Sequence, residues 1–166
     1  MTTSQMETAT VLGISPGTRY MGLALLRDGE LYSWKVRSYK GICTPEKLEN
    51  TLSYIEELII SNVVKNIACK MPHPGRISNR LKNVMQQIRE IAEEYGIECN
   101  IYSLEDLREL FKMKFANKYI LAEHIANRFP QLTDLLIRER KNKHRYHICT
   151  FEAVAAGMRC HQDCYL

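Results

Sequence analysis

Three apolar runs joined by very short links, near the start of the chain, constrain the fold more than any other feature. The first run, residues 10–15, ends at the turn dipeptide Pro16-Gly17. The second, residues 21–26, is followed by Asp28-Gly29, which favours a type I′ hairpin turn, and residues 30–39 then alternate as a strand does. Links this short leave no room for a crossover helix, so the three runs predict an antiparallel β-meander.

Beyond residue 40 the hydrophobic pattern changes from strand spacing to helix spacing. Thr44 followed by Pro45 is typical of a helix start, Ser78 and Asn117 can cap two further helices, and Ser103 with Asp106 resembles a capping box. The sequence predicts, in order, a helix over 45–63, a strand over 66–71, a helix over 78–95, a strand over 97–102, and helices over 103–112, 118–129 and 147–160.

The two long predicted helices each have one apolar face, formed by Leu48, Leu52, Ile55, Ile59 and Val63 in the first and by Leu81, Met85, Ile88, Ala92 and Tyr95 in the second. Crossovers of this length normally join parallel neighbouring strands. We therefore expect an α/β fold with a five-stranded mixed sheet, in which a three-stranded antiparallel meander is extended by two parallel strands and flanked by helices.

Composition fits one globular domain with a sizeable core. Hydrophobic residues make up 45% of the 166 and charged residues 25%, and no apolar run approaches the ~18 residues that would span a membrane. Residues 1–9 are polar and lack a signal-peptide pattern, so we expect a disordered tail there, a single domain over 10–166 and a cytoplasmic protein that makes no use of a membrane.

The six cysteines are expected to be free thiols in a reducing compartment. A zinc site built from Cys160, His161 and Cys164 is the alternative interpretation. The fourth ligand is hard to supply, because Cys149 would stand about 16 Å from Cys160 on one helix, whereas zinc ligands lie within ~2.3 Å of the metal.

Residues 13–17, G-I-S-P-G, match the nucleophile elbow of α/β-hydrolases, G-x-S-x-G. The match does not predict a hydrolase. A strand rather than a helix follows Ser15, and the oxyanion hole would need the backbone N–H of the next residue, which is Pro16 and has none.

A longer stretch, residues 12–22 (L-G-I-S-P-G-T-R-Y-M-G), resembles the opening of RuvC-type Holliday junction resolvases, G-I-D-P-G-x-x-x-x-G. Chain length, element order and a final alanine-rich helix over residues 151–160 are similar as well. YqgF-like resolvases, which usually lack the Pro-Gly pair, are the second choice. The resemblance implies an RNase H-like fold, in which nuclease members hold two divalent metal ions with carboxylates.

Laid on this sequence, the family pattern implies a degenerate metal site. The four acidic positions correspond to Ser15, Lys70, Cys149 and Glu152, so Glu152 is the only retained acid. We expect no catalytic residue, no metal and no cofactor, with Mg²⁺ or Mn²⁺ used if any activity survives. Lys70 could hold a phosphate in place of the metal; alternatively, its side chain points to solvent and Ser15 merely caps the turn. His73 and His147 could join Glu152 in binding Zn²⁺ or Mn²⁺.

Positive charge gathers in two segments of the sequence, residues 70–80 after the predicted fourth strand and residues 138–145 before the last helix. Residues 138–145 alone carry five cations against one Glu, which equals the net charge of +4 of the chain. This run predicts either a solvated loop or a phosphate-binding patch. In the RNase H-like arrangement both segments approach the former metal site. The predicted nucleic-acid-binding residues are Lys70, Arg76, Arg80, Arg138, Arg140, Lys141, Lys143 and Arg145.

The resulting hypothesis is a catalytically inactive or strongly impaired RuvC-like protein that binds nucleic acid, DNA rather than RNA, with branched DNA as a candidate ligand. The first alternative is an interaction or scaffold protein on the same fold, and the second is a weak Mn²⁺-dependent endonuclease centred on Glu152. The resemblance also implies a homodimer that uses the helix over 78–95.

Overall fold

The computed structural model describes residues 8–113, 117–141 and 147–166. Its centre is a five-stranded mixed sheet in the order β3-β2-β1-β4-β5. The antiparallel pairs are β1–β2 and β2–β3, and the parallel pairs are β1–β4 and β4–β5. This confirms the predicted meander and its parallel extension, with strands β1 (Thr10–Ser15), β2 (Tyr20–Arg27), β3 (Glu30–Ser38), β4 (Asn66–Lys70) and β5 (Glu98–Tyr102).

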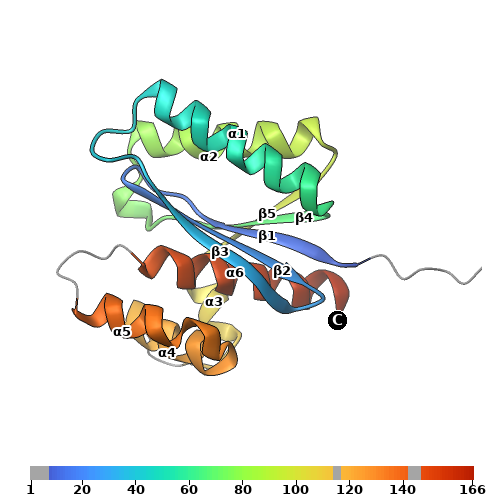
Figure 1. Cartoon of the computed structure of the whole chain (residues 1–166), viewed down its shortest axis with the longest axis vertical. Coiled ribbons are helices and arrows are strands. Elements are labelled where there is room, and N and C mark those ends of the chain that lie inside the picture. Colours follow the sequence, from blue (N-terminus) through green and yellow to red (C-terminus); the bar gives the residue numbers. More distant parts are fainter. Residues whose placement is uncertain (1–7, 114–116, 142–146) are drawn as a thin grey trace, which may run out of the picture.

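Helices α1 (Pro45–Asn62) and α2 (Asn79–Glu94) cover one face of the sheet (Figure 1). The Thr44 and Ser78 side chains accept hydrogen bonds from the first turn of each helix, as expected of N-caps. Two details of the predicted faces were wrong. Val63 lies beyond α1 in a left-handed conformation and is exposed, and Met85 is only half-buried on α2, where Val84 and Ile91 face the core instead.

The other face of the sheet is covered by α6 (Ile148–Tyr165), with α3 (Leu104–Glu109), α4 (Lys118–Arg128) and α5 (Thr133–Lys141) packed outside it (Figure 1). The two faces form separate cores, because alternate strand residues point to opposite sides. On the α6 side the core includes Phe129, Phe151 and Leu121, all fully buried.

The sequence pattern did not predict α5. Residues 138–141, which the charge run left as a possible loop, belong to this helix. Asp134 lies in the first turn of α5 and Arg138, Arg140 and Lys141 in the last, the charge distribution that a helix dipole favours. Two short 3₁₀ turns, Pro74–Arg76 and Pro130–Leu132, were also not predicted. The last helix extends five residues beyond its predicted end at Cys160, to Tyr165.

Gly13 and Gly22 let α6 lie directly on the sheet. A Cβ atom at Gly13 would overlap the backbone carbonyl of Ala153, and one at Gly22 would overlap that of Cys149. These glycines are the first and last of the motif that resembles the resolvase opening. Their absent side chains fix how closely the start of α6 approaches the end of β1.

Residues 1–7 of the expected tail lie outside the described residues. Ala9 is buried, its N–H donates to Asp28 Oδ1, and its carbonyl accepts from the Asp28 N–H, each at 2.9 Å. Among the described residues, no helix is both long and apolar enough to cross a membrane.

Candidate functional site

A cleft of about 1330 Å³ opens where β1 and β4 end and α4 and α6 begin. Its lining comes from six stretches of the chain, between residue 15 and residue 152. Lys and Arg side chains outnumber acidic ones in this lining, with Arg19, Lys70, Arg108 and Lys118 against Glu105 and Glu152. A cleft with this balance attracts anions.

Strand register places Ser15 and Lys70 side by side in the lining of the cleft. Gly13 pairs with Ala68 in the parallel β1–β4 ladder, so two residues further along Ser15 and Lys70 end adjacent strands on the face toward α6. Ser15 is 5% exposed and Lys70 8% exposed. The interpretation in which the Lys70 side chain points to solvent is therefore wrong.

Lys70 forms an ion pair with Glu152, which projects from the first half of α6. The other carboxylate oxygen of Glu152, Oε1, lies 3.5 Å from the Nζ atom of Lys118 at the start of α4. The Glu152 side chain is 3% exposed, while that of Lys118 is 32% exposed and faces the cleft. Two ammonium groups and one carboxylate give this cluster a net charge of +1.

These residues do not fit the metal pair that the fold family implies. A divalent ion such as Mg²⁺ needs several oxygen ligands, preferably carboxylates. Ser15, Lys70 and Cys149 supply no carboxylate, and both oxygens of Glu152 already face ammonium groups. In the described part of the chain, no three His, Cys, Asp or Glu side chains are grouped so that they could hold a metal ion.

The start of α6 is held by buried groups beside the cleft. Glu139 of α5 is fully buried, and its Oε2 accepts a hydrogen bond from the His147 backbone N–H at 2.8 Å. Burial lowers the pKa of the His147 imidazole, against the raising effect of Glu139. Burial, reinforced by the negative charge of Glu152, raises the pKa of the Cys149 thiol to about 12. Cys149 is thus a protonated, unreactive thiol near neutral pH.

The two alternative metal sites are not assembled either. His73 lines the cleft, but its Nδ1 accepts from the Gly75 N–H at 3.2 Å and completes a local turn. The Sγ atoms of Cys160 and Cys164 lie 4.0 Å apart, but among the described residues no further His, Cys, Asp or Glu side chain joins them as a third ligand.

Among the predicted nucleic-acid-binding residues whose side chains the structure describes, only Lys70 lies in the lining of the cleft. Arg80 is exposed at the start of α2, outside this lining. Arg138, Arg140 and Lys141 are exposed on α5, also outside it, and Arg140 pairs with Glu123 of α4. Lys143, Arg145 and the side chain of Arg76 lie outside the described parts of the structure.

Sequence reasoning missed Lys118, Arg19 and Arg108 in the cleft. Lys118 alone carried a detectable signal. It occupies the first residue of α4, directly after the Asn117 cap, where the helix dipole disfavours a cation. In the structure, the carboxylate of Glu152 offsets this unfavourable position.

No family model matches the sequence, and no curated protein matches it. Solved structures do match. Thermus thermophilus RuvC in complex with a Holliday junction substrate gives a TM-score of 0.65 at 16% identity over 91% of each chain. Another T. thermophilus RuvC structure gives 0.67 at 15% identity, over 90% of this chain and 92% of that one.

A viral protein matches over an even larger share of the chain. Fowlpox virus resolvase, in a complex with Holliday junction DNA, gives a TM-score of 0.60 at 8% identity, over 95% of this chain and 99% of that one. The chain therefore has the RNase H-like fold of RuvC and of the fowlpox virus resolvase, with a Lys70–Glu152–Lys118 ion-pair cluster at the ends of β1 and β4.

Proposed function

We propose that this protein binds nucleic acid, and branched DNA in particular, in the cleft at the ends of β1 and β4, without cleaving it by metal-ion catalysis. The observation that carries the proposal is the buried ion pair between Lys70 and Glu152, with Lys118 on the second carboxylate oxygen. It places positive charge where a nuclease of this fold needs negative charge.

The balance of charge in the cleft supports binding of a phosphate backbone. Arg19, Arg108 and Lys118 line the same cleft as Lys70, and the Lys118 side chain retains enough exposure to reach a bound anion. Cationic side chains of this kind supply most of the sequence-independent affinity for nucleic acid. DNA is favoured over RNA because RuvC and the fowlpox virus resolvase were solved with Holliday junctions.

Electrostatic repulsion supports the absence of two-metal catalysis. At an effective dielectric constant of 20, a unit charge 4 Å from another contributes about 4 kcal/mol, and a divalent ion doubles this. The Lys70 ammonium is fixed beside Glu152 and would oppose any Mg²⁺ bound there. The same group attracts a phosphate.

Fluorescence anisotropy with a labelled four-way junction, a plain duplex and a single strand, each at two salt concentrations, tests the proposal. We expect salt-sensitive binding with preference for the junction, weakened about eightfold at 0.1 M salt by Lys118→Gln if Lys118 makes one phosphate contact. Arg128→Gln, which removes a cation paired with Glu30 on the surface, is the matched control. Light scattering on the same samples tests the expected homodimer.

Two outcomes would replace the proposal. Absence of binding to all three substrates would leave the scaffold function. Junction cleavage in Mn²⁺ that Glu152→Gln abolishes would establish the weak nuclease instead.

A further inference from the structure

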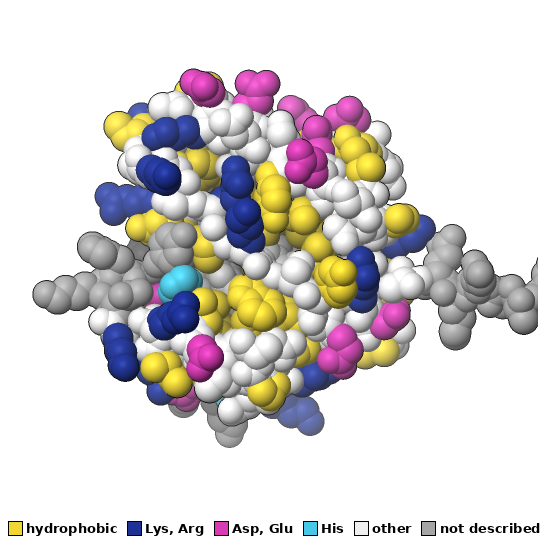
Figure 2. All heavy atoms as spheres, viewed as in Figure 1, with side chains coloured by type: hydrophobic (Ala, Val, Ile, Leu, Met, Phe, Trp, Pro, Cys, Tyr) yellow, Lys and Arg dark blue, Asp and Glu magenta, His cyan; other side chains and the backbone are white. Residues whose placement is uncertain are grey.

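A strip of cationic side chains runs from the rim of the cleft across the end of β3 to the starts of α1 and α2. We call it the basic strip, and it consists of Arg19, Lys35, Arg37, Lys40, Lys47 and Arg80. Arg37 and Lys47 are half-buried, and the other four are exposed. Figure 2 shows Lys and Arg side chains gathered over this part of the surface. Arg19 lies in the stretch that resembles the resolvase opening, and Arg80 is one of the predicted nucleic-acid-binding residues. The sequence offered no functional prediction for the other four.

Two cation–π contacts make the strip continuous at its β3 end. The Lys35 Nζ atom lies 4.7 Å from the centre of the Tyr54 ring, and the Arg37 guanidinium carbon lies 4.9 Å from it. Both cations therefore contact the same ring on α1, which limits their side-chain conformations in the absence of a ligand. Two residues apart on one strand, they are spaced by about 7 Å.

The strip continues to the cleft through the β3–α1 connection. The Lys47 ammonium donates to the backbone carbonyls of Lys40 and Ile42, each at 3.3 Å, which holds this connection against α1. The buried Tyr39 donates its backbone N–H to the Arg19 carbonyl at 3.0 Å, and Arg19 itself lines the cleft.

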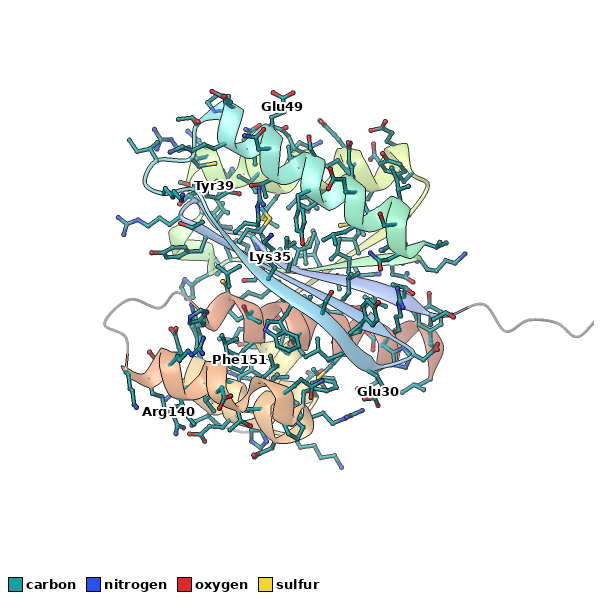
Figure 3. All side chains as sticks on the ribbon, in the orientation of Figure 1. Glu30, Lys35, Tyr39, Glu49, Arg140 and Phe151 are labelled. Atoms are coloured by element: carbon teal, nitrogen blue, oxygen red, sulfur yellow. The ribbon has the colours of Figure 1, made fainter. Side chains whose placement is uncertain are left out.

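Acidic residues do not neutralise this surface. Residues 31–45 contain no Asp or Glu, and within the described residues none of the six cations forms an ion pair. In Figure 3, Glu49 points outward from α1, away from the sheet on which Lys35 lies. The exposed Glu46 precedes Lys47 in the first turn of α1 and offsets part of the charge there, so the positive potential of the strip comes mainly from Arg19, Lys35, Arg37, Lys40 and Arg80.

We propose that the basic strip binds the sugar–phosphate backbone of a duplex arm that leaves the cleft. This inference rests on the proposed function and adds where the DNA runs. A duplex carries one negative charge per ~1.7 Å of its axis, so a strip of cations that starts at the cleft rim meets several phosphates in succession. Contacts of this type position DNA without reading its sequence.

The test compares two double variants in the full chain. Lys35→Gln with Arg37→Gln removes two strip cations and their contacts with an aromatic ring. Arg27→Gln with Arg128→Gln is matched, because it also removes two cations that lie over aromatic rings, at 3.7 and 4.6 Å, but Arg27 ends β2 at the hairpin, away from the cleft.

We expect the strip variant to lower the salt slope of log K for a long-armed junction by about 1.8 and its affinity on the order of 50-fold at 0.1 M salt. The control should change affinity less than twofold, and exchanging the two cations, Lys35→Arg with Arg37→Lys, should preserve binding. With arms too short to leave the cleft, the strip variant and the wild-type protein should bind equally.

The failures of the two proposals can be told apart. If the wild-type protein binds the junction and the strip variant matches the control, the strip is not a binding surface while the cleft proposal stands. If the wild-type protein binds no nucleic acid, both are wrong. Thermal midpoints of all variants show whether each is folded.

Discussion

Glu152→Gln tests whether the ion pair in the cleft contributes to the stability of the folded protein. The substitution keeps the shape of the side chain and removes its charge. Lys70, which is 8% exposed, then keeps a buried ammonium without its carboxylate. Removing one partner of a buried pair is costly because the remaining charge stays away from water.

The expected destabilisation is about 3 kcal/mol, at the lower end of the ~3–5 kcal/mol typical of a broken buried pair. The lower end applies because Lys70 borders the cleft, and its side chain, 10% exposed, can turn partly toward water. For a chain of 166 residues, 1 kcal/mol shifts the thermal midpoint by roughly 2–4 °C. We therefore expect the midpoint to fall by roughly 6–12 °C.

Calorimetry or urea unfolding measures this change against a matched control, Glu109→Gln. Glu109 pairs with Arg159 at 3.0 Å, but its side chain is 68% exposed, so its loss should cost less than about 1 kcal/mol. Adding Lys70→Met to Glu152→Gln should recover much of the stability, since no charge is then stranded. Equal, small shifts in Glu152→Gln and Glu109→Gln would refute the reasoning.

Three further predictions concern the fold around the cleft. Gly13→Ala should destabilise the protein by roughly 2–3 kcal/mol in urea unfolding, because its methyl group meets the backbone of α6, whereas Gly75→Ala, with its nearest neighbour 3.4 Å away, should cost little. Burial raises the pKa of both Cys149 and Cys160 to about 12, from an ordinary 9.0. Between about pH 9 and pH 12 these thiols are therefore protonated in the folded protein and ionised in the unfolded one. The free energy of unfolding should therefore fall as the pH rises from about 9 toward 12, and Cys→Ala variants should flatten that dependence. Ser103→Ala removes one half of the capping box of α3 and should cost about 1 kcal/mol in the same assay.

The sheet could be predicted because its information is local. Residues 10–39 carry alternation and two turn signals, and the caps at Thr44, Ser78 and Ser103 fix three helix starts within a few residues of each. Helix α5 could not be predicted in this way. Its run of charges resembles a solvated loop, and the helix is stabilised by distant packing through its buried residues, Leu136 and Glu139.

Individual residues of the candidate site could be predicted from the sequence, but the contacts between them could not. Lys70 and Glu152 were assigned through the resemblance to the resolvases, but their pairing depends on how closely α6 lies on the sheet, which Gly13 and Gly22 determine. Lys118 joins them across 34 positions of sequence. The basic strip was hidden for another reason, because Lys35 and Arg37 look like ordinary solvent-facing residues of an edge strand until Tyr54 of α1 is placed beneath them.

If the proposed function is right, the absence of cleavage and the presence of binding have one cause, the change from negative to positive net charge at this site. Four acids, as the resolvase resemblance implies for active members, favour divalent cations at the end of β1 and β4. Here the cluster of Lys70, Lys118 and Glu152 has a net charge of +1, so the same position favours the phosphate itself over the ion that would help to cleave it. Restoring one acid at Ser15 would leave the Lys70 ammonium in place and the repulsion unchanged. A metal centre therefore requires Lys70 to be replaced first, whereas binding requires it, or another cation, to stay.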